Sequence, residues 1–488
     1  MLCTRRSMFH AMVLSICFVA ASGRAQTPGT RSAEQTWVGS WAASQQIPEP
    51  RNALPEEDLT DATMRQIIHL SIGGRMLRVH MSNAFGTEPL TLAAVHIARA
   101  VSPASSEIVA GSDRALTFSG AMSVTIPAGA EYVSDPMEYT VAPLSSLTIT
   151  FYEQKPPAQE TSHPGSRATT YYTHGDRVDA EDLPGAKTIE HWYTISGVDV
   201  MAPRGAFAVV TLGDSITDGH AATTNGNNRW PDVLAERLQG SAKTREIAVL
   251  NLGTGGNRLL NDGLGPDALA RFDRDVLAQA GTRYVMVLEG VNDLGTLHGA
   301  LITPPEQSAP AEGEHTQAGS PQQAPTPPTS STSPFGAVSA ASGTAATTAA
   351  SAEGVPAARQ RMRFHFGEAT PEQHEELVKS IIGAYEQIVL RAHAAGIKVI
   401  GTTITPFGGS GYGRQSPERE AGREKINAWI LTPGHFDAVV DFAKVVADPQ
   451  DPSRMAANFD SGDHLHPSVA GYRAMGDAIP LSLFEQRH

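Results

Sequence analysis

The sequence predicts an α/β domain with a parallel sheet, preceded by a β-sandwich or jelly-roll-like domain. Short runs that alternate apolar and polar residues dominate residues 37–200, as in antiparallel strands with one buried face. Over residues 203–488, continuous apolar runs alternate with helical stretches, which is the pattern of a parallel sheet with helices on both faces. We therefore expect a β-rich accessory domain over 37–200 and an α/β domain over 203–488.

The first 25 residues predict a secretory signal peptide. Arg5 and Arg6 precede an apolar stretch over 8–21, and small residues follow as far as Ala25. An apolar stretch of about 14 residues is too short to span a bilayer comfortably, which argues against the alternative of a membrane anchor. We expect cleavage after Ala25 and a secreted or periplasmic protein without stable membrane insertion.

Removal of this peptide would leave a chain with no cysteine and a strongly negative charge. Both cysteines, Cys3 and Cys17, lie within it, so we expect neither disulfides nor thiolate metal sites. The peptide also holds three of the 37 basic side chains, so 34 would remain against 51 acidic ones, a formal charge of −17. This charge argues against nucleic acid and anionic membrane surfaces as partners, and it favours a neutral substrate.

Within the β-rich region, residues 65–85 predict a β-hairpin. Two alternating runs flank Gly73 and Gly74, which can supply the positive φ angles of a tight turn. Residues 90–100 and 145–154 predict further strands, and the proline and glycine residues between them favour a sandwich or jelly roll.

Five apolar runs predict the strands of the parallel sheet: 207–212, 246–251, 284–288, 398–405 and 438–442. A helix is expected over 230–238, where Pro231 suits the first turn. A longer helix is expected over 371–396, with Gly396 as its stop.

Residues 302–363 interrupt this alternation. They are rich in Pro, Ser, Thr, Ala and Gly, and Phe335 is their only aromatic residue. Such a composition offers too little apolar surface to offset the entropy of ordering, so we expect a disordered insertion. A surface spacer is favoured over the alternative of a specific docking role.

The sequence Gly-Asp-Ser-Ile-Thr-Asp-Gly directly follows the first predicted strand of the parallel sheet. Ser215 would therefore lie at the carboxyl end of a strand, where ligands of open α/β sheets bind. A serine nucleophile needs a base to remove its proton and hydrogen-bond donors to stabilise the oxyanion. The alternative is a serine that only caps a helix.

A candidate base lies near the C-terminus, in the sequence Asp-Ser-Gly-Asp-His-Leu-His. Asp463 and His466 are three residues apart, so one turn can place the carboxylate against one imidazole nitrogen and leave the other facing Ser215. Asp460 and His464 are rival members. All four side chains suit zinc as well, although a metal site would leave the serine motif unexplained.

Two loops, after the second and third strands, can supply the oxyanion donors. Gly255 and Gly256 offer main-chain N–H groups on a glycine-rich loop, and Asn292 offers a side-chain amide. Taken singly, such residues more often belong to simple turns.

Together, the blocks GDSIT, GTGGN, GVND and DHLH, in this order on alternating strands and helices, resemble the GDSL or SGNH hydrolase family. The resemblance covers the chain from about residue 203 to 488. It implies the family's flavodoxin-like three-layer fold around a parallel sheet, and a serine esterase that hydrolyses carboxylic esters through an acyl-enzyme.

Carried over onto this sequence, the resemblance makes Ser215 the nucleophile and Asp463 and His466 the other members of the triad. Gly256, Asn292 and the main-chain N–H of Ser215 become the oxyanion hole, with Gly256 chosen over its neighbour by its spacing along the block. No cofactor and no metal are implied.

Two features depart from the compact family pattern. The β-rich region precedes the first block, and the long insertion follows the block of Asn292, where part of it can shade the site. Secreted bacterial members with a similar preface and GDSITDG often act on acylated or acetylated carbohydrates. The resemblance therefore implies a small-molecule or polysaccharide ester as substrate, with the β-rich region supporting or walling the cleft.

Two rival functions compete with this interpretation. A lipase or thioesterase with a longer acyl pocket would use the same catalytic residues. A non-catalytic carbohydrate-binding protein would instead use exposed aromatic side chains that stack on sugars, although aromatic residues in β-rich segments are more often buried in the core. The candidates for stacking are Trp37, Trp41, Trp192, Tyr171 and Tyr172.

Overall fold

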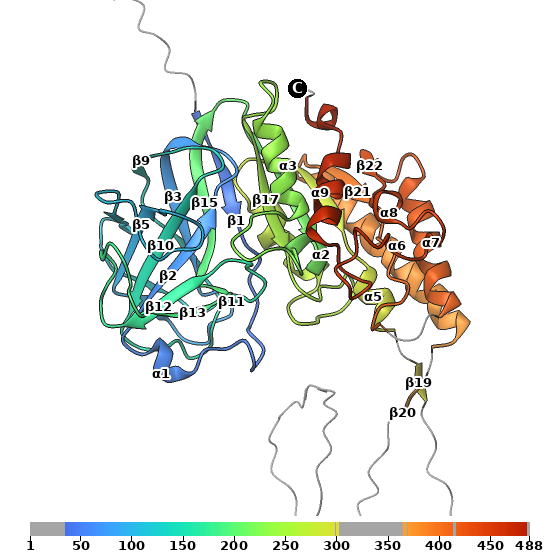
Figure 1. The fold of residues 1–488 in the computed structure, drawn as a ribbon, viewed down its shortest axis with the longest axis horizontal. Helices are drawn as coiled ribbons and strands as arrows, with labels where there is room; N and C mark the ends of the chain where they lie inside the picture. Colours follow the sequence, from blue (N-terminus) through green and yellow to red (C-terminus); the bar gives the residue numbers. More distant parts are fainter. Residues whose placement is uncertain (1–34, 298, 302–364, 368, 413–415, 486–488) are drawn as a thin grey trace, which may run out of the picture. The chain divides into compact units, whose positions relative to one another are not determined.

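The computed structural model describes residues 35–297, 299–301, 365–367, 369–412 and 416–485 (Figure 1). The described residues up to Leu297 and from Pro371 onward pack into one compact unit. The described residues between Leu297 and Pro371 belong to a second unit, in which β19 (Gly299–Leu301) pairs with β20 (His365–Gly367). The predicted signal peptide and the predicted insertion lie outside the described residues.

The β-rich region consists mainly of two antiparallel sheets (Figure 1). The first has the order β1-β15-β3-β8, with β9 also paired to β3. Its strands are β1 (Gln35–Ala42), β3 (Gly74–Ser82), β8 (Glu131–Val133), β9 (Met137–Val141) and β15 (Ile195–Pro203). The second has the order β13-β12-β2-β10-β5-β6. Its strands are β2 (Ala62–His69), β5 (Ala94–Arg99), β6 (Arg114–Ala115), β10 (Ser146–Glu153), β12 (Thr170–His174) and β13 (Lys187–Ile189).

Smaller elements complete this region. They are the strand pairs β4 (Leu90–Leu92) with β7 (Val124–Ile126) and β11 (Ser162–His163) with β14 (Trp192–Tyr193), and the short helix α1 (Glu56–Leu59). The β-rich N-terminal region is thus confirmed. Its finer description as a sandwich or a jelly roll stays a prediction.

The hairpin predicted at Gly73 and Gly74 is wrong. The two runs do form strands, but β2 pairs with β10 and β12, whereas β3 pairs with β15, β8 and β9 in the other sheet. The chain crosses between sheets instead of turning back. The glycines are needed for space, since a Cβ on Gly73 would lie 2.5 Å from the carbonyl oxygen of Val141 and one on Gly74 would lie 2.8 Å from Cβ of Val200. Alternation reveals a strand, but not which strand it pairs with.

The second region contains the predicted parallel sheet, with strands in the order β17-β16-β18-β21-β22. Its members are β16 (Phe207–Gly213), β17 (Ile247–Gly253), β18 (Thr282–Leu288), β21 (Lys398–Thr402) and β22 (Ala438–Val440), so all five predicted strands are present. Every residue of β16 is buried, as expected for a strand covered on both faces. After β16 the chain adds β17 on one side of this strand and then β18 on the other, so the carboxyl end of β16 is the topological switch point.

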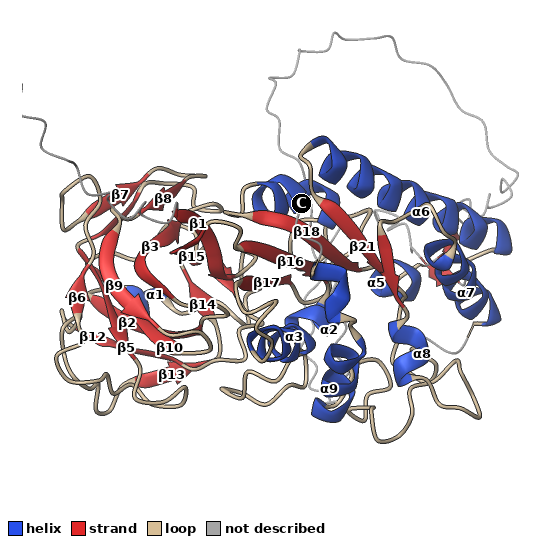
Figure 2. Ribbon diagram, turned by 90° about the horizontal axis from the view of Figure 1, so that it is seen from above, coloured by secondary structure: helices blue, strands red, loops and turns tan. Residues whose placement is uncertain are grey.

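Helices lie on both sides of this sheet (Figure 2). On one side are α6 (Pro371–Ala394) and α7 (Pro417–Leu431); on the other are α3 (Trp230–Gln239), α8 (Phe442–Val446) and α9 (Val469–Ala478). Short helices follow the strand ends: α2 (Ser215–Asp218), α4 (Ala268–Phe272) with a π-helical continuation over Asp273–Leu277, α5 (Val291–Gly295) and a closing 3₁₀ turn at Leu481–Phe484. Both predicted helices are present.

The β-rich and α/β regions share polar contacts and one hydrophobic core. The Gly39 N–H donates to the carbonyl of Ala280 at 2.9 Å, and the Val249 N–H donates to the hydroxyl of Ser71 at 3.1 Å. Apolar residues of both regions belong to a single buried cluster. The predicted division into domains over 37–200 and 203–488 stays a prediction.

Candidate active site

The nucleophile candidate stands at the first position of helix α2. β16 ends at Gly213, and Asp214 is the N-cap, with its carboxylate accepting from the Ile216 N–H at 2.8 Å. Capping is therefore done by Asp214 and not by Ser215, so the alternative of a capping serine does not hold. The Ser215 hydroxyl is left to bond elsewhere.

Ser215, His466 and Asp463 form a continuous hydrogen-bonded chain. The Ser215 Oγ lies 2.8 Å from His466 Nε2, and His466 Nδ1 lies 2.6 Å from a carboxylate oxygen of Asp463. The other Asp463 oxygen accepts from the main-chain N–H groups of Leu465 at 3.0 Å and of His466 at 2.9 Å. The spacing of three residues thus closes a turn that aims the imidazole at the serine. A hydroxyl, an imidazole and a carboxylate in this order are the groups that serine acyl transfer requires.

Burial and hydrogen bonding act in opposite directions on this pair. Burial lowers the pKa of His466 below the usual value, and the bond to Asp463 offsets part of that shift. For Asp463, burial opposes ionisation, but the hydrogen bonds from His466 and Leu465 outweigh it and lower the pKa well below the usual value. Near neutral pH the imidazole is therefore neutral and the carboxylate ionised, as a base and its orienting partner must be.

The rival pair forms its own separate contact. His464 Nδ1 lies 2.5 Å from Asp460, whose second oxygen accepts from the N–H groups of Gly462 and His464. No hydrogen bond among the described residues links this pair to Ser215. The four residues proposed as an alternative metal site are thus divided between two pairs, and both ring nitrogens of His466 are already engaged.

The candidate oxyanion donors lie on two loops that follow Ser215 in the sequence. Gly256 adopts a left-handed φ of 67°, and its N–H meets no acceptor among the described residues. Asn292, on α5, is buried; its amide donates to the carbonyl of Asn257 at 2.8 Å, and its oxygen accepts from the Tyr412 hydroxyl. An amide has two hydrogens, so one remains for a substrate. The oxyanion role of Gly256, Asn292 and the Ser215 N–H stays a prediction.

A buried arginine that no sequence motif marked connects these strand ends. Arg271 donates to the carbonyls of Gly213 at 3.0 Å and Leu252 at 2.6 Å, and to Asn257 Oδ1 at 2.8 Å. It also pairs with Asp275 at 2.9 Å. The serine strand and the glycine-rich loop are therefore held by one guanidinium, whose rigid fork of donors suits several acceptors at once.

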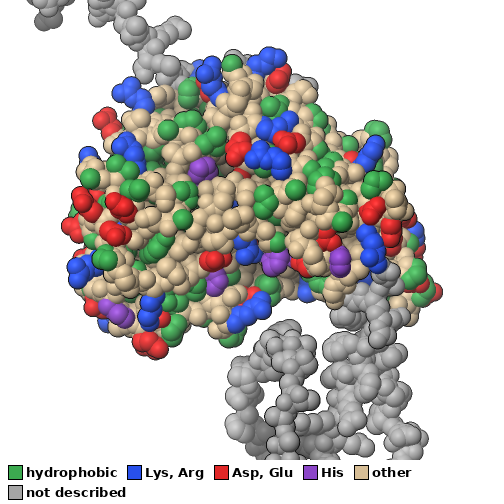
Figure 3. Space-filling model, in the orientation of Figure 1, with side chains coloured by type: hydrophobic (Ala, Val, Ile, Leu, Met, Phe, Trp, Pro, Cys, Tyr) green, Lys and Arg blue, Asp and Glu red, His purple; other side chains and the backbone are tan. Residues whose placement is uncertain are grey.

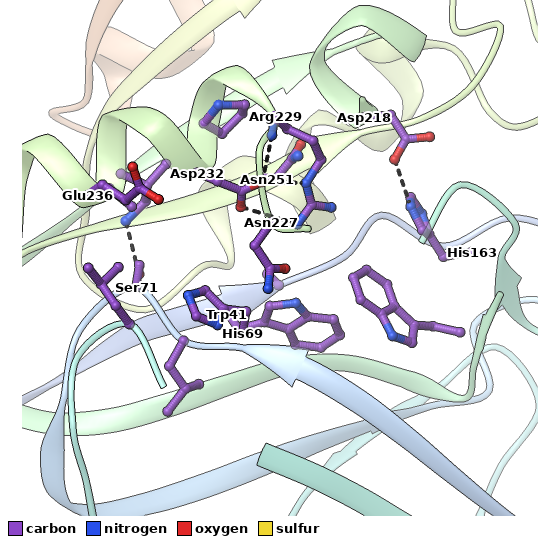
Figure 4. A pocket seen from close by; sticks show the side chains of 17 residues that line it. Trp41, His69, Ser71, His163, Asp218, Asn227, Arg229, Asp232, Glu236 and Asn251 are labelled. Carbon is purple, nitrogen blue, oxygen red and sulfur yellow. Dashed lines mark hydrogen bonds and ion pairs between the residues drawn. The ribbon is translucent and has the colours of Figure 1, made fainter. Parts of the chain in front are cut away.

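The β-rich region reaches helix α2 through a third His–Asp pair. His163 Nε2 lies 2.9 Å from Asp218, and His163 Nδ1 lies 2.7 Å from the carbonyl of Ser44. Figure 4 shows His163 pointing toward Asp218 beside a pocket lined from both regions. Both side chains of the pair are only 3% exposed. Asp218 is three residues from Ser215, so this contact fixes the helix that carries the nucleophile.

His220, just beyond α2, packs against His466 with ring centroids 4.1 Å apart and the ring planes tilted by 39°. Its Nδ1 lies 3.2 Å from a guanidinium nitrogen of Arg167, which comes from the β-rich region. Burial, followed by the positive potentials of His466 and Arg167, lowers the pKa of His220 to about 4. His220 is therefore neutral and accepts from Arg167. No sequence motif marked either Arg167 or His163, because both depend on how the β-rich region folds back.

The aromatic residues of the carbohydrate-binding rival are mostly core residues. Trp41, Trp192 and Tyr172 are buried, and Trp41 packs edge-on against Trp192 with ring centroids 4.9 Å apart. Trp37 is half-buried beneath the guanidinium of Arg78, 4.7 Å from its ring centroid. The three buried rings are thus closed to sugars.

A family model places the chain among known proteins. The model of the GDSL-like lipase/acylhydrolase family matches residues 211–474, which is more than half of the sequence and contains all four blocks. Together with a serine, an imidazole and a carboxylate at the carboxyl ends of a parallel sheet, this match defines a serine hydrolase. The chain belongs to the GDSL-like lipase/acylhydrolase family and is a carboxylic ester hydrolase.

Solved structures show distant likeness. A GDSL-like lipase from Bacteroides thetaiotaomicron is 15% identical, with 57% of this chain and 88% of that one covered, at a TM-score of 0.32. An acetyl xylan esterase from Geobacillus stearothermophilus is 18% identical, with 57% and 94% covered, at a TM-score of 0.31. No match was found among curated protein sequences. Among the described residues, no helix has the length and apolar character needed to cross a membrane.

Proposed function

We propose that this chain is a secreted or periplasmic serine esterase that removes short acyl groups, chiefly acetyl, from carbohydrate. The single observation that supports the mechanism best is the chain of hydrogen bonds from Ser215 through His466 to Asp463. The substrate class follows from the resemblance of the β-rich preface and of GDSITDG to secreted carbohydrate esterases, and the location follows from the predicted signal peptide.

In the proposed mechanism, His466 takes the proton of Ser215 as its oxygen attacks the ester carbonyl. Asp463 holds the imidazole in the tautomer with hydrogen on Nδ1 and stabilises the imidazolium that forms. The N–H groups of Ser215 and Gly256 and the amide of Asn292 bind the oxyanion. His466 then gives its proton to the departing alcohol, and a water molecule repeats the sequence on the acyl-enzyme to release the acid.

The first test is acetate release from a short aryl acetate by the purified mature protein, with Ser215→Ala alongside. We expect turnover by the wild type and a loss of about 10⁴- to 10⁶-fold in the variant. Ser123→Ala, an exposed serine of the β-rich region, is the matched control and should be as active as wild type. Equal activity of wild type and Ser215→Ala would rule out Ser215 as the nucleophile.

A series of acyl chain lengths separates the proposed activity from a lipase or thioesterase. Each additional methylene that an apolar pocket accepts contributes about 0.8 kcal/mol of burial, or roughly fourfold in kcat/KM. We expect kcat/KM to fall from acetyl to octanoyl esters, and acetate release from acetylated polysaccharide. A rise along the series would favour the longer acyl pocket.

N-terminal sequencing of the exported protein tests the location, with the mature chain expected to begin after Ala25.

A further inference from the structure

Arg167 extends from the β-rich region to the proposed active site without a carboxylate partner. One terminal nitrogen donates to His220 Nδ1 at 3.2 Å, and Nε is buried without an acceptor among the described residues. No ion pair of Arg167 is formed with any described residue. A guanidinium is always charged and carries five donors, so this one retains both charge and unused donors.

The main chain holds Arg167 in place from both regions. Its φ of 49° lies in the left-handed region, which non-glycine residues rarely adopt. Its carbonyl accepts from the Asn225 N–H at 2.8 Å, and the Asn225 side chain bonds the main chain of Thr169 at 2.8 Å and its hydroxyl at 2.9 Å. Such conformations persist where the surroundings over-determine them, often at ligand sites. The main-chain position from which the Arg167 side chain extends is therefore built into the fold.

The acidic groups around Arg167 are already paired with other partners. Asp463 binds His466, and Asp218 binds His163. The positive charge of Arg167 contributes to the lowered pKa of both His220 and His466, which indicates that the guanidinium lies close to the imidazole that moves the proton. The guanidinium of Arg167 therefore remains as a cation beside the reacting groups.

The side of the site on which Arg167 lies indicates which part of a substrate it meets. A general acid must stand next to the departing alcohol oxygen, so the alcohol portion of the ester lies on the His466 side of Ser215. The ring of His220 packs against that of His466, and Arg167 donates a hydrogen bond to His220. The guanidinium is thus adjacent to the alcohol portion, while the oxyanion donors Gly256 and Asn292 face the acyl carbonyl.

We propose that Arg167 binds a carboxylate on the alcohol portion of the substrate, so that the enzyme prefers esters of hydroxy acids, such as acylated acidic sugars, to neutral esters. This inference rests on the proposed serine esterase function and adds the charge of its substrate. Arg and carboxylate form paired, charge-assisted hydrogen bonds, which supply direction as well as attraction.

The negative charge of the whole chain does not oppose this preference at short range. Charges of both signs are interspersed over the face shown in Figure 3, and at physiological salt the field of an exposed charge decays over about 8 Å. The expectation of a neutral substrate came from the sum of charges, whereas a bound carboxylate experiences the nearest groups.

The test compares two acetyl esters that differ in charge, 4-acetoxybenzoate and 4-acetoxybenzamide, and then O-acetylated galacturonic acid and O-acetylated galactose. Each is assayed with wild type, Arg167→Gln, Arg167→Lys and the control Arg177→Gln, which removes an exposed arginine of the same region. The ratio of kcat/KM for the charged and the neutral ester, compared between variants, cancels the different reactivity of the two esters.

We expect Arg167→Gln to lower this ratio about 10- to 100-fold, mainly through KM, with Arg167→Lys between wild type and Gln and with Arg177→Gln unchanged. High salt should reduce the ratio in wild type only. An equal loss on both esters with a shifted pH profile would mean that Arg167 acts through His466, and no change would mean that it binds nothing; either overturns the proposal. Neutral-ester turnover by wild type but not by Ser215→Ala keeps the esterase function independent of this result, whereas its absence removes both.

Discussion

The α/β region and the β-rich region each direct one histidine to the four-residue helix α2. His466 of the α/β region contacts Ser215 at its start, and His163 of the β-rich region contacts Asp218 at its end. Each histidine also has a main-chain or carboxylate acceptor on its other nitrogen. The surroundings differ: the Asp463 side chain is 43% exposed, whereas both members of the His163–Asp218 pair are 3% exposed.

The two sites show what distinguishes a histidine that can transfer a proton from one that only supports the fold. The nitrogens of His163 face a carboxylate and a main-chain carbonyl, so neither partner is a hydroxyl whose proton the ring could take. Nε2 of His466 faces a hydroxyl, which can give it a proton. The same pair of residue types therefore positions a helix in one place and can move a proton in the other.

The largest effect on activity is expected when His466 is replaced. Replacing it with Asn should lower kcat by about 10⁴- to 10⁶-fold, because the serine loses its base. The matched control is His464→Asn, in the same loop and also bound to an aspartate, which should change kcat by less than about threefold. Steady-state kinetics on an aryl acetate measures both. A comparable loss in the two variants would show that the loop, and not the base, had been disturbed.

A smaller effect is expected at the oxyanion donor of the α/β region. Asn292→Ala should lower kcat by about 10²- to 10³-fold with little change in KM, since the amide bonds the oxyanion more strongly than the carbonyl it develops from. Asn261→Ala, an exposed asparagine on the neighbouring loop, serves as control. An unchanged kcat in Asn292→Ala would remove this residue from the oxyanion hole.

His163→Ala should act on stability more than on rate. It leaves Asp218 buried without its partner, which costs about 3 to 5 kcal/mol in the free energy of unfolding. We expect kcat of the folded enzyme to fall by less than tenfold, because no reacting atom is lost. Denaturant unfolding and kinetics at a temperature where the variant is folded separate the two quantities, and adding Asp218→Asn should restore part of the stability. His174→Ala, exposed in the same region, is the control. A fall in kcat of much more than tenfold in the folded variant would show that this pair takes part in the chemistry.

The mildest perturbation is pH. A base must be unprotonated, so kcat/KM should rise with pH through the pKa of His466 and then level off. Because burial lowers this pKa, the rise should be centred below 6.5, the ordinary value for histidine, and activity should persist into mildly acidic solution. A pH profile of kcat/KM, taken within the range in which the enzyme stays folded, measures it. A midpoint above 6.5 would contradict the environment described for His466.

Much of the site could be predicted from the sequence because its parts are local. The block GDSIT contains a strand end and the candidate nucleophile within a few residues, and Asp463 and His466 close a single turn. These relations depend on spacing along the chain. The five strands of the parallel sheet were equally visible, since each contains a continuous apolar run, and all but the edge strand β22 are largely buried.

Pairing between distant segments was not visible in the same way. The runs on either side of Gly73 and Gly74 were correctly identified as strands, but they entered different sheets, because alternation fixes which face of a strand is buried and not which neighbour completes it. Likewise, nothing in the composition of the β-rich region distinguished Arg167 or His163 from other polar residues.

By itself, the sequence determined the strand-and-helix order, the serine and the histidine–carboxylate turn that can activate it. Only the tertiary structure decided that the β-rich region supplies His163 and Arg167. The physical reason is range: caps and turns are settled by neighbours in the chain, whereas the partner of a buried charge is whichever distant group the packing brings within a few ångströms.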